Sequence, residues 1–306
     1  MHAEGQRFDS VILHQKNKKY NYERRNIAGR PIVTEEYKSY CDIKKIQFQI
    51  DGGIKSYDDT TLFCPAGMQQ FKSKFKDENY KGTISNIQSC LRLNDIDEIG
   101  DGTHLLYFNM IGFFSFREWS VPQTIDYWME FLNRIGITPD YVTIHPDKPE
   151  WSEWYQKWNV KVVIDPECVW SDGEIGGYCT EFYKNDIEIG NIVNPLGTCI
   201  DVGFGLERLD MILDGVGKTK EQTLRETINK MIESGFKPGN TKQDYILRKL
   251  LRLSHKNKIE IDHKFYEDEV LRQEKLLIKW EKLKDKHKDK PKEWWFDTHG
   301  IDLDLI

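Results

Sequence analysis

Short alternating or fully apolar stretches recur along residues 45–213 and predict β-strands. Alternation of apolar and polar positions is typical of a strand with one buried face. The run HLLYFNMIGFFSF is apolar almost throughout and is typical of a strand buried on both faces. The predicted strands are, in order, KIQFQI, TLFCPA, NIQSCLRL, HLLYFNMIGFFSF, YVTIHP, VKVVIDP, GGYCTEFY, EIGNIVNP and TCIDVG.

Helical spacing separates several of these strands and dominates the chain after Gly215. In PQTIDYWMEFLNRIG the apolar positions recur at helical spacing, with proline at the start and glycine as a stop. GMQQFKSKF, PEWSEWYQKW and GLERLDMIL predict further helices. These patterns predict an α+β fold, in which an antiparallel sheet flanked by helices is followed by a helical domain. We expect an N-terminal extension over 1–44, the sheet domain over 45–215 and the lysine-rich helical domain over 216–306.

Composition narrows the class of protein. The chain of 306 residues has a formal net charge of −6, so any contact with nucleic acid must come from a local basic face. No apolar run approaches the roughly 20 residues that span a bilayer, and the first residues lack the apolar core of a signal peptide. We therefore expect a cytoplasmic protein without a membrane partner. The six cysteines are scattered, with no C-x-x-C pair, and predict neither a disulfide framework nor a zinc site.

The stretch CIDVGFGLER places an arginine at the start of a predicted helix. Gly203 and Gly205 precede Arg208 and allow close approach of a ligand to the backbone. A helix N-terminus favours anions, and the forked guanidinium suits a phosphate group. The alternative is an ordinary ion pair of Arg208 with Glu207 or Asp210.

A second arginine favours the phosphate interpretation. Arg92 ends a predicted strand, and a loop leads to His104 and Phe108 on the returning strand. This order outlines a nucleotide-binding hairpin, with the aromatic ring stacked on a purine. A core position for Phe108 and an ordinary strand position for His104 are the alternatives. Asp201 lies in an apolar strand end, where a carboxylate needs a cationic partner such as a ligand amine.

Eight stretches in chain order resemble class II aminoacyl-tRNA synthetases, and more closely the catalytic core of the alanyl-tRNA synthetases. The resemblance spans roughly residues 45–306 and implies the class II synthetase fold with an ATP-dependent ligase activity. The stretches are TTLFCPAGMQQFKSKF, QSCLR, FNMIGFFSF, GGYCTEFY, EIGNIV, CIDVGFGLER, DYILRKLLR and WWFDTHGIDLDLI.

The resemblance implies that the chain uses ATP and Mg²⁺. Arg92 would hold the α-phosphate, and Arg208 would hold the γ-phosphate. Phe108 would stack on adenine, with His104 near the phosphates. The groups that would face Mg²⁺ and phosphate are Glu188, which would hold Mg²⁺ through ATP, and Asn191.

The resemblance also implies a small amino-acid substrate, alanine in the first place. Asp201 would pair with the α-amino group, and Trp170 would line the pocket. Gly203 and Gly205 would keep its floor small. Gly190 stands where the family has tryptophan, and we expect this change to reshape one wall of the pocket.

The helix predicted near residues 242–258 is basic and implies contact with the tRNA acceptor stem. Asn240, just before this helix, lies where the family has an asparagine that reads the stem. Arg248, Lys249 and Arg252 are the candidate cations of a basic stripe, although lysine-rich helices more generally present a solvated face.

Three functions remain open at this stage. The first is a truncated alanine–tRNA ligase, without the editing and C-terminal domains of the family. The second is a ligase that transfers the activated amino acid to a nucleobase, peptide or carrier. The third is a non-catalytic nucleotide-binding relative. The sequence leaves the oligomeric state open.

Overall fold

The computed structural model describes residues 32–301 and 303, and these form two compact units. The sheet unit comprises the chain up to Gly52 together with Ala66–Ser89 and Phe108–Gly217. The helical unit comprises Gly53–Pro65, Cys90–Tyr107 and the chain from Lys218 onward. The last crossing between the units, after Gly217, lies near the boundary expected at residue 215. The sheet unit is nevertheless not one continuous stretch over 45–215, because two segments of that stretch belong to the helical unit.

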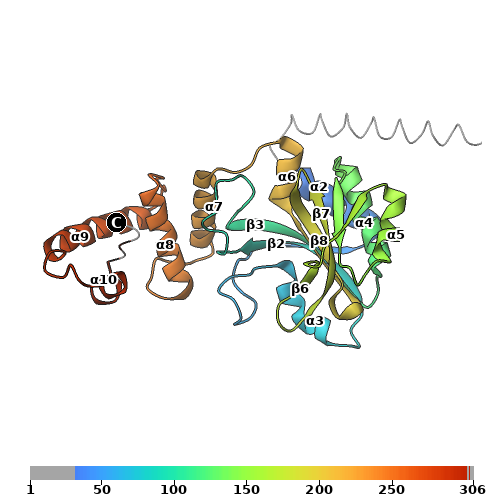
Figure 1. Ribbon diagram of the computed structural model, residues 1–306, viewed down its shortest axis with the longest axis horizontal. Helices are drawn as coiled ribbons and strands as arrows, with labels where there is room; N and C mark the ends of the chain where they lie inside the picture. Colours follow the sequence, from blue (N-terminus) through green and yellow to red (C-terminus); the bar gives the residue numbers. More distant parts are fainter. Residues whose placement is uncertain (1–31, 302, 304–306) are drawn as a thin grey trace, which may run out of the picture. The chain divides into compact units, whose positions relative to one another are not determined.

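The sheet unit is built on a mixed sheet with the strand order β1-β2-β3-β9-β8-β7-β4-β5, and β6 pairs with β7 (Figure 1). The pairs β3–β9, β8–β9, β7–β8 and β4–β7 are antiparallel, as expected. The edge pairs β1–β2 and β4–β5 are parallel. The strands are β1 (Gln47–Asp51), β2 (Gly82–Leu91), β3 (Tyr107–Phe116), β4 (Tyr141–Ile144), β5 (Lys161–Ile164), β6 (Val169–Ser171), β7 (Gly176–Lys184), β8 (Ile187–Val193) and β9 (Cys199–Gly205).

One face of this sheet packs against helices through an aromatic core. Phe204 of β9 stacks on Trp128, with ring centroids 4.2 Å apart, and Tyr37 stacks on the same tryptophan. The helix that carries Trp128 ends at Gly136, whose φ of 85° is the left-handed conformation that glycine adopts readily. The helices of this unit are α2 (Ile32–Lys44), α3 (Lys72–Lys76), α4 (Val121–Ile135), α5 (Trp151–Tyr155) and α6 (Leu206–Asp214), with short 3₁₀ turns η1 (Gly67–Phe71), η2 (Gln156–Trp158) and η3 (Pro195–Gly197).

Three local expectations need correction. Residues 32–44 of the expected extension form helix α2, whose Val33 and Tyr37 are fully buried in the main core. Residues 1–31 of that extension lie outside the described residues. The stretch TLFCPA forms no strand and contributes only an isolated bridge between Lys55 and Phe63. The short strand β6, by contrast, is absent from the predicted elements.

The helical unit contains α7 (Lys220–Glu233), α8 (Lys242–Lys256), α9 (Lys264–Leu283) and α10 (Lys292–His299) (Figure 1). The helical period of this part of the sequence is therefore confirmed. Its core joins Leu224 and Ile228 of α7 with Leu247, Leu250 and Leu251 of α8. Among the described residues, no helix has the length and apolar character needed to cross a membrane.

Candidate functional site

Polar and small residues gather on the sheet face opposite the Trp128 core. Residues paired across neighbouring strands point to the same face of a sheet. One row of paired residues runs from Glu181 through Asn191 to Gly203 and Gly112. The next row runs from Cys179 through Val193 to Asp201 and Phe114. Strand register therefore brings Asn191 of β8 to the same surface as Asp201 and Gly203 of β9.

Arg208 lies in the first turn of α6, directly after β9. Its Nη1 donates to the main-chain oxygen of Glu188 at 2.8 Å, and Nη1 lies 3.7 Å from Glu188 Oε2. Asn191 Nδ2 donates to Glu188 Oε1 at 3.3 Å. The structure thus brings three of the predicted site residues together. The ion pair that Arg208 makes is with Glu188, whereas Glu207 accepts hydrogen bonds from Asn109.

Asp201 is a buried carboxylic acid in the second row. Its side chain is 8% exposed, and burial raises its pKa to about 7, with a further contribution from the negative charge of Asp172. Within the described part of the chain, no hydrogen bond or ion pair neutralises the Asp201 carboxylate. Asp172 itself pairs with Lys72 at 3.0 Å. Ionisation of Asp201 therefore costs free energy unless a cation from outside the chain pairs with the carboxylate.

The glycines of this face set how close other groups approach. A Cβ on Gly203 would meet Met110 Sδ at 3.0 Å, and one on Gly205 would lie 3.4 Å from the Arg208 side chain. The absence of a side chain at Gly203 thus leaves room for Met110 beside the strand. Gly190 does not lie on this face, although we expected it to shape a wall of the pocket. A Cβ there would lie 2.3 Å from the Phe204 ring, so Gly190 faces the core on the opposite side of the sheet.

Trp170 lies on β6, paired with Gly177 of β7. Its ring packs against two small clusters of buried residues, one containing Phe114 and Cys199 and the other Cys179 and Val193. Phe114 and Val193 are the strand partners of Asp201. The predicted pocket tryptophan therefore lies on the same side of the sheet as the predicted amine-binding acid.

In the helical unit, Arg92 and His104 are held by their own loops. Arg92 is exposed, and its Nε donates to the main-chain oxygen of Pro65 at 2.8 Å. The two ring nitrogens of His104 face Asp101 at 2.5 Å and Glu98 at 3.3 Å. Although partial burial opposes it, hydrogen bonds from His104 and Thr103 hold the pKa of Asp101 well below its usual range. Phe108, half-buried, is the first residue of β3 within the sheet unit.

Two of the three cations expected in the basic stripe on α8 instead contact Glu269 of α9. Arg252 is 5% exposed, and its Nε donates to Glu269 Oε1 of α9 at 2.7 Å. Arg248 also lies against Glu269, at 3.4 Å, and donates to Asn240. These two arginines join α8 to α9 and to the preceding loop, so the assignment of Arg252 to an RNA surface is corrected. Lys249 is exposed.

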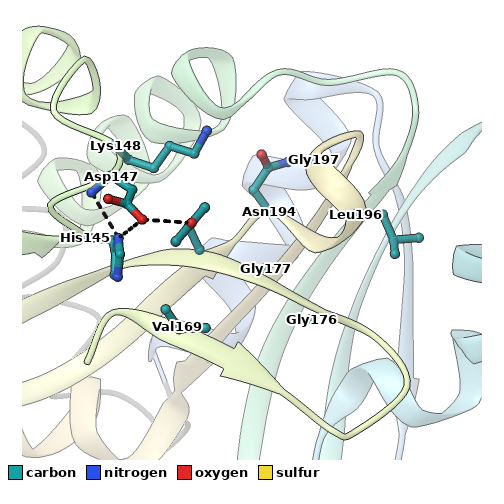
Figure 2. Close-up of a pocket in the computed structure, with 10 residues that line it drawn as sticks. His145, Asp147, Lys148, Val169, Gly176, Gly177, Asn194, Leu196 and Gly197 are labelled. Carbon is teal, nitrogen blue, oxygen red and sulfur yellow. Dashed lines mark hydrogen bonds and ion pairs between the residues drawn. The ribbon is translucent and has the colours of Figure 1, made fainter. Parts of the chain in front are cut away.

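A separate cavity of about 560 Å³ opens in the sheet unit, and none of the predicted site residues lines it (Figure 2). On one side, the rings of His145 and Tyr178 lie 4.5 Å apart, and Tyr178 donates to Asp147 at 3.1 Å. On the other side lie Asn194 and Leu196, just after the end of β8.

Sequence reasoning missed one charged neighbour of Asp201 and the cation that pairs with this neighbour. Asp172 raises the pKa of Asp201, and Lys72 is the partner of Asp172. Asp172 directly follows β6, which the sequence did not predict as a strand, so alternation gave no signal for it. Lys72, far away in sequence at the start of α3, had no signal either.

Comparisons of the sequence and structure with known proteins find similarity to aminoacyl-tRNA synthetases. Residues 53–175 match the family model described as tRNA synthetases class II (A). An alanine–tRNA ligase of Desulfitobacterium hafniense is 27% identical, over 70% of this chain and 34% of that protein. One of Tropheryma whipplei is 29% identical, over 65% and 31% respectively. A pyrrolysyl-tRNA synthetase structure from D. hafniense shares 14% identity at a TM-score of 0.43, covering 72% of this chain and 83% of that one.

The chain spans about a third of the length of the curated relatives that it matches. The family match contains Arg92, His104, Phe108 and Trp170, while the sequence similarity to the alanine–tRNA ligases extends over about two thirds of the chain. The resemblance noted from the motifs is thereby confirmed. Residues 53–175 thus match the class II tRNA synthetases, and the chain as a whole is similar to part of the alanine–tRNA ligases.

Proposed function

We propose that this protein activates alanine, or another small amino acid, with ATP and transfers it to the acceptor end of a tRNA. The observation that carries the proposal is Asp201, a buried acid with a pKa of about 7 and no cationic partner among the described residues. A bound ammonium group would offset the cost of ionising this acid. The α-amino group of an amino acid supplies such a cation.

The surroundings of Asp201 favour a small substrate. Gly203 lies in the neighbouring row of the same sheet face, with the Met110 side chain of β3 beside it, and Trp170 packs over the strand partners of Asp201. In our proposal, Trp170 lines the amino-acid pocket, and Gly203 and Gly205 form its floor. Alanine is the choice that the named relatives suggest.

The phosphate end of the proposed site uses Arg208, Glu188 and Asn191. Only one N–H group of the Arg208 guanidinium is committed to Glu188 at hydrogen-bond distance, and the side chain is 32% exposed. The remaining donors suit the γ-phosphate of ATP. Glu188 and Asn191 present carboxylate and amide oxygens, the donor class that Mg²⁺ prefers. These residues fit a Mg²⁺ ion carried by ATP, which would neutralise phosphate charge.

The remaining ATP contacts are proposed from the motifs. Arg92, exposed and oriented by its bond to Pro65, would bind the α-phosphate. Phe108 would stack on adenine. His104, already held by Asp101 and Glu98, would lie near the phosphates and set the shape of its loop.

The reaction needs no tuned general base. A carboxylate oxygen of the amino acid attacks the α-phosphorus of ATP, the bond to the β-phosphate oxygen breaks, and pyrophosphate leaves. Aminoacyl-adenylate remains, and a ribose hydroxyl of the tRNA end then displaces AMP. Positioning and neutralisation of charge supply the catalysis, so well-placed arginines matter most.

For tRNA, we propose the exposed lysines of α8 together with Asn240. Lys242, Lys249 and Lys256 are exposed and spaced by seven residues, so they follow one side of the helix. The Arg248 side chain bonds Asn240 and fixes the loop that precedes the helix. Since tRNA charging takes place where translation does, we assign the protein to the cytoplasm.

Amino-acid-dependent exchange between ATP and pyrophosphate tests the proposal. We expect exchange with alanine in the absence of tRNA, and weaker exchange with serine or glycine, because a pocket separates such small side chains poorly. Attachment of labelled alanine to tRNA then tests the acceptor. If ATP–pyrophosphate exchange occurs but no alanine is attached to tRNA, the proposed activation of the amino acid stands and the proposal of tRNA as the acceptor is overturned.

A further inference from the structure

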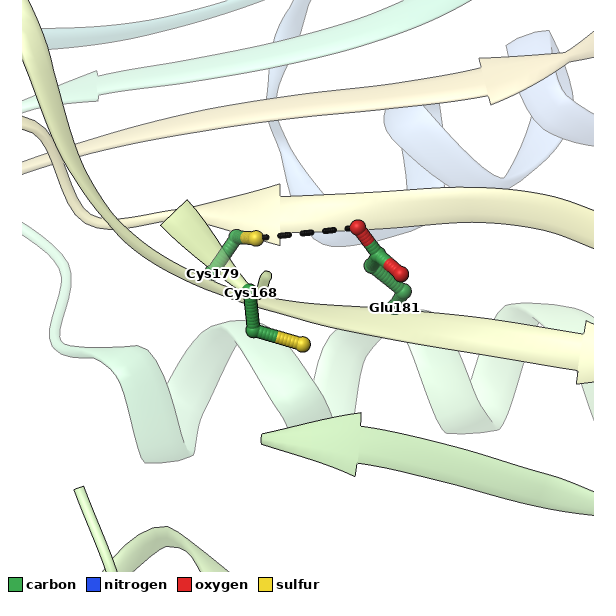
Figure 3. Close-up of side chains that lie close together, drawn as sticks. All are labelled: Cys168, Cys179 and Glu181. Atoms are coloured by element: carbon green, nitrogen blue, oxygen red, sulfur yellow. Dashed lines mark hydrogen bonds between the residues drawn. The ribbon is translucent and has the colours of Figure 1, made fainter. Parts of the chain in front are cut away.

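Two cysteines and a glutamate converge between β6 and β7 (Figure 3). Cys168 immediately precedes β6 and Cys179 lies on β7, where the main-chain N–H of Cys179 donates to the oxygen of Cys168 at 2.9 Å. Glu181 is two residues further along β7 and therefore points to the same face as Cys179. The two thiol sulfurs and one carboxylate oxygen all lie within 4.8 Å of one another.

The two thiols of the cluster are shielded from water, whereas Glu181 is half-buried. Cys168 is fully buried and Cys179 is 2% exposed. Val193 and the ring of Trp170 pack against both cysteines. Cys179 Sγ lies 3.8 Å from Glu181 Oε1. In a tetrahedral zinc site, ligand atoms at normal bond lengths lie about 3.5–3.8 Å apart, so the three groups need only a small inward adjustment.

Neighbouring hydroxyl groups orient the carboxylate. The Tyr183 hydroxyl donates to Glu181 Oε2 at 2.7 Å, and Thr143 Oγ1 lies 3.4 Å from the same oxygen. These contacts hold one carboxylate oxygen and leave Oε1 directed toward Cys179. The thiol of Cys168 contacts Thr143 Oγ1 at 3.0 Å. Hydrogen bonds of this kind to the ligands of a metal are typical of built sites, because they fix the ligand geometry.

The charges around the cluster are acidic. Glu188 and Asp165 place negative charge near Glu181. A divalent cation would offset this charge, because it stabilises thiolate and carboxylate together.

We infer that Cys168, Cys179 and Glu181 form a zinc-binding site, with water completing a tetrahedral coordination shell. Two thiolates and one carboxylate match the donors that Zn²⁺ accepts, and they are too soft a set for Mg²⁺. The bound ion links β6 to β7 and so fixes the strand that carries Trp170. The scattered cysteines of the sequence predict no zinc, and this inference replaces that expectation. The spacing of 11 residues hides a pair that only strand pairing brings together.

The three zinc ligands are not among the residues of the proposed adenylate site, although Trp170 packs beside both. Two strand spacings, about 10 Å, separate Cys179 from Asp201 across the sheet. A test by metal binding alone is therefore independent of the proposed ligase activity.

Titration of the metal-free, reduced, full-length chain with Co²⁺ tests the site. We expect one Co²⁺ per chain, with thiolate-to-cobalt absorption and the visible bands of a tetrahedral ion, and we expect Zn²⁺ to displace it. Cys168→Ser and Cys179→Ser each remove a ligand and should weaken Co²⁺ binding by about 100-fold or more, whereas Tyr183→Phe removes only an orienting contact and should weaken it by about 10-fold.

Cys199→Ser is the matched control, because Cys199 is also a fully buried thiol but lies on β9 outside the cluster. It should keep the wild-type affinity and spectrum. If a cysteine variant fails to fold, Glu181→Gln and Tyr183→Phe still test the site. The inference is overturned if wild-type protein shows no thiolate–cobalt absorption, or if the Cys168 and Cys179 variants keep it unchanged.

Discussion

Arg208 donates from Nη1 to the main-chain oxygen of Glu188 at 2.8 Å, which anchors the start of α6 to β8. The anchor uses one donor of a group that has five N–H bonds. The guanidinium is thus held in place while most of its donors stay available for an anion. This relationship explains why a permanently charged, forked side chain follows Gly205 at a strand-to-helix junction.

Arg208→Ala should lower alanine-dependent ATP–pyrophosphate exchange by about 10²- to 10³-fold, because the substitution removes a positioned charge that neutralises the transition state. Arg208→Lys should recover only part of the rate, since an ammonium group cannot make both forked contacts. Initial exchange rates at saturating alanine and ATP measure both effects.

Arg225→Ala is the control for the arginine variants. Arg225 forms an exposed pair with Glu221 within α7, and its removal should leave exchange within about twofold of wild type. Circular dichroism should show that all three variants are folded. Exchange at the wild-type rate in a folded Arg208→Ala protein would contradict the role of Arg208.

Asp201→Asn should raise the KM for alanine by at least about 10-fold and leave the KM for ATP nearly unchanged, because a neutral amide cannot pair with an ammonium group. The wild-type KM for alanine should also rise as the pH falls below about 7, where the Asp201 carboxylate takes up a proton. A variant that loses ATP affinity while keeping alanine affinity would disprove the amine-binding role.

Asp201→Asn should also stabilise the folded protein against unfolding at high pH. Burial raises the pKa of Asp201 from the ordinary 3.8 to about 7, so the folded state holds its proton more tightly than the unfolded state. The resulting destabilisation is complete above about pH 7 and disappears below about pH 4. A shift of about three pKa units corresponds to about 4 kcal/mol at most. Urea unfolding at about pH 8 should therefore show Asp201→Asn to be more stable than wild type, and at about pH 4 the two should agree.

Alanine substitution of Lys242, Lys249 and Lys256 together should weaken tRNA binding without affecting exchange. A plot of the logarithm of the binding constant against the logarithm of salt concentration has a negative slope. This slope should become shallower by about one for each removed lysine that neutralises a phosphate. Filter binding at several salt concentrations measures the slope. Lys157→Ala, an exposed lysine paired with Asp126 in the sheet unit, should leave the slope unchanged.

Arg252→Ala should destabilise the helical unit by about 3–5 kcal/mol, because it leaves Glu269 as a buried and partly unpaired charge. Replacing both residues with leucine should cost less, since Glu269 then no longer remains as a buried charge, although Arg248 loses the same partner. Denaturant unfolding compares the three proteins. Equal destabilisation by the single and double substitutions would contradict an ion pair between Arg252 and Glu269 as the cause.

The sequence was most informative where local pattern determines structure. The alternation in GGYCTEFY, EIGNIV and TCIDVG predicted β7, β8 and β9, and the glycine-flanked arginine predicted the junction with α6. Those strands also carry Asp201, Asn191 and Gly203, so much of the candidate site followed from the same pattern.

Features that depend on distant contacts could not be predicted. Arg252 reads as an exposed cation on a basic helix until α9 places Glu269 against it. Gly190 reads as part of a pocket wall until the strand direction places it against Phe204. Cys168 and Cys179 read as isolated thiols until β6 pairs with β7. In each case the partner is fixed by packing rather than by spacing along the chain.

Formation of the adenylate itself is the most direct test of the central claim. Protein mixed with ATP, Mg²⁺, labelled alanine and pyrophosphatase, without tRNA, should retain about one labelled alanyl-adenylate per active chain after rapid gel filtration. Asp201→Asn and Arg208→Ala proteins should retain much less after the same brief incubation at an alanine concentration near the wild-type KM. Absence of adenylate in the folded wild-type protein at saturating ATP and alanine would contradict the account, and so would equal amounts in all three proteins.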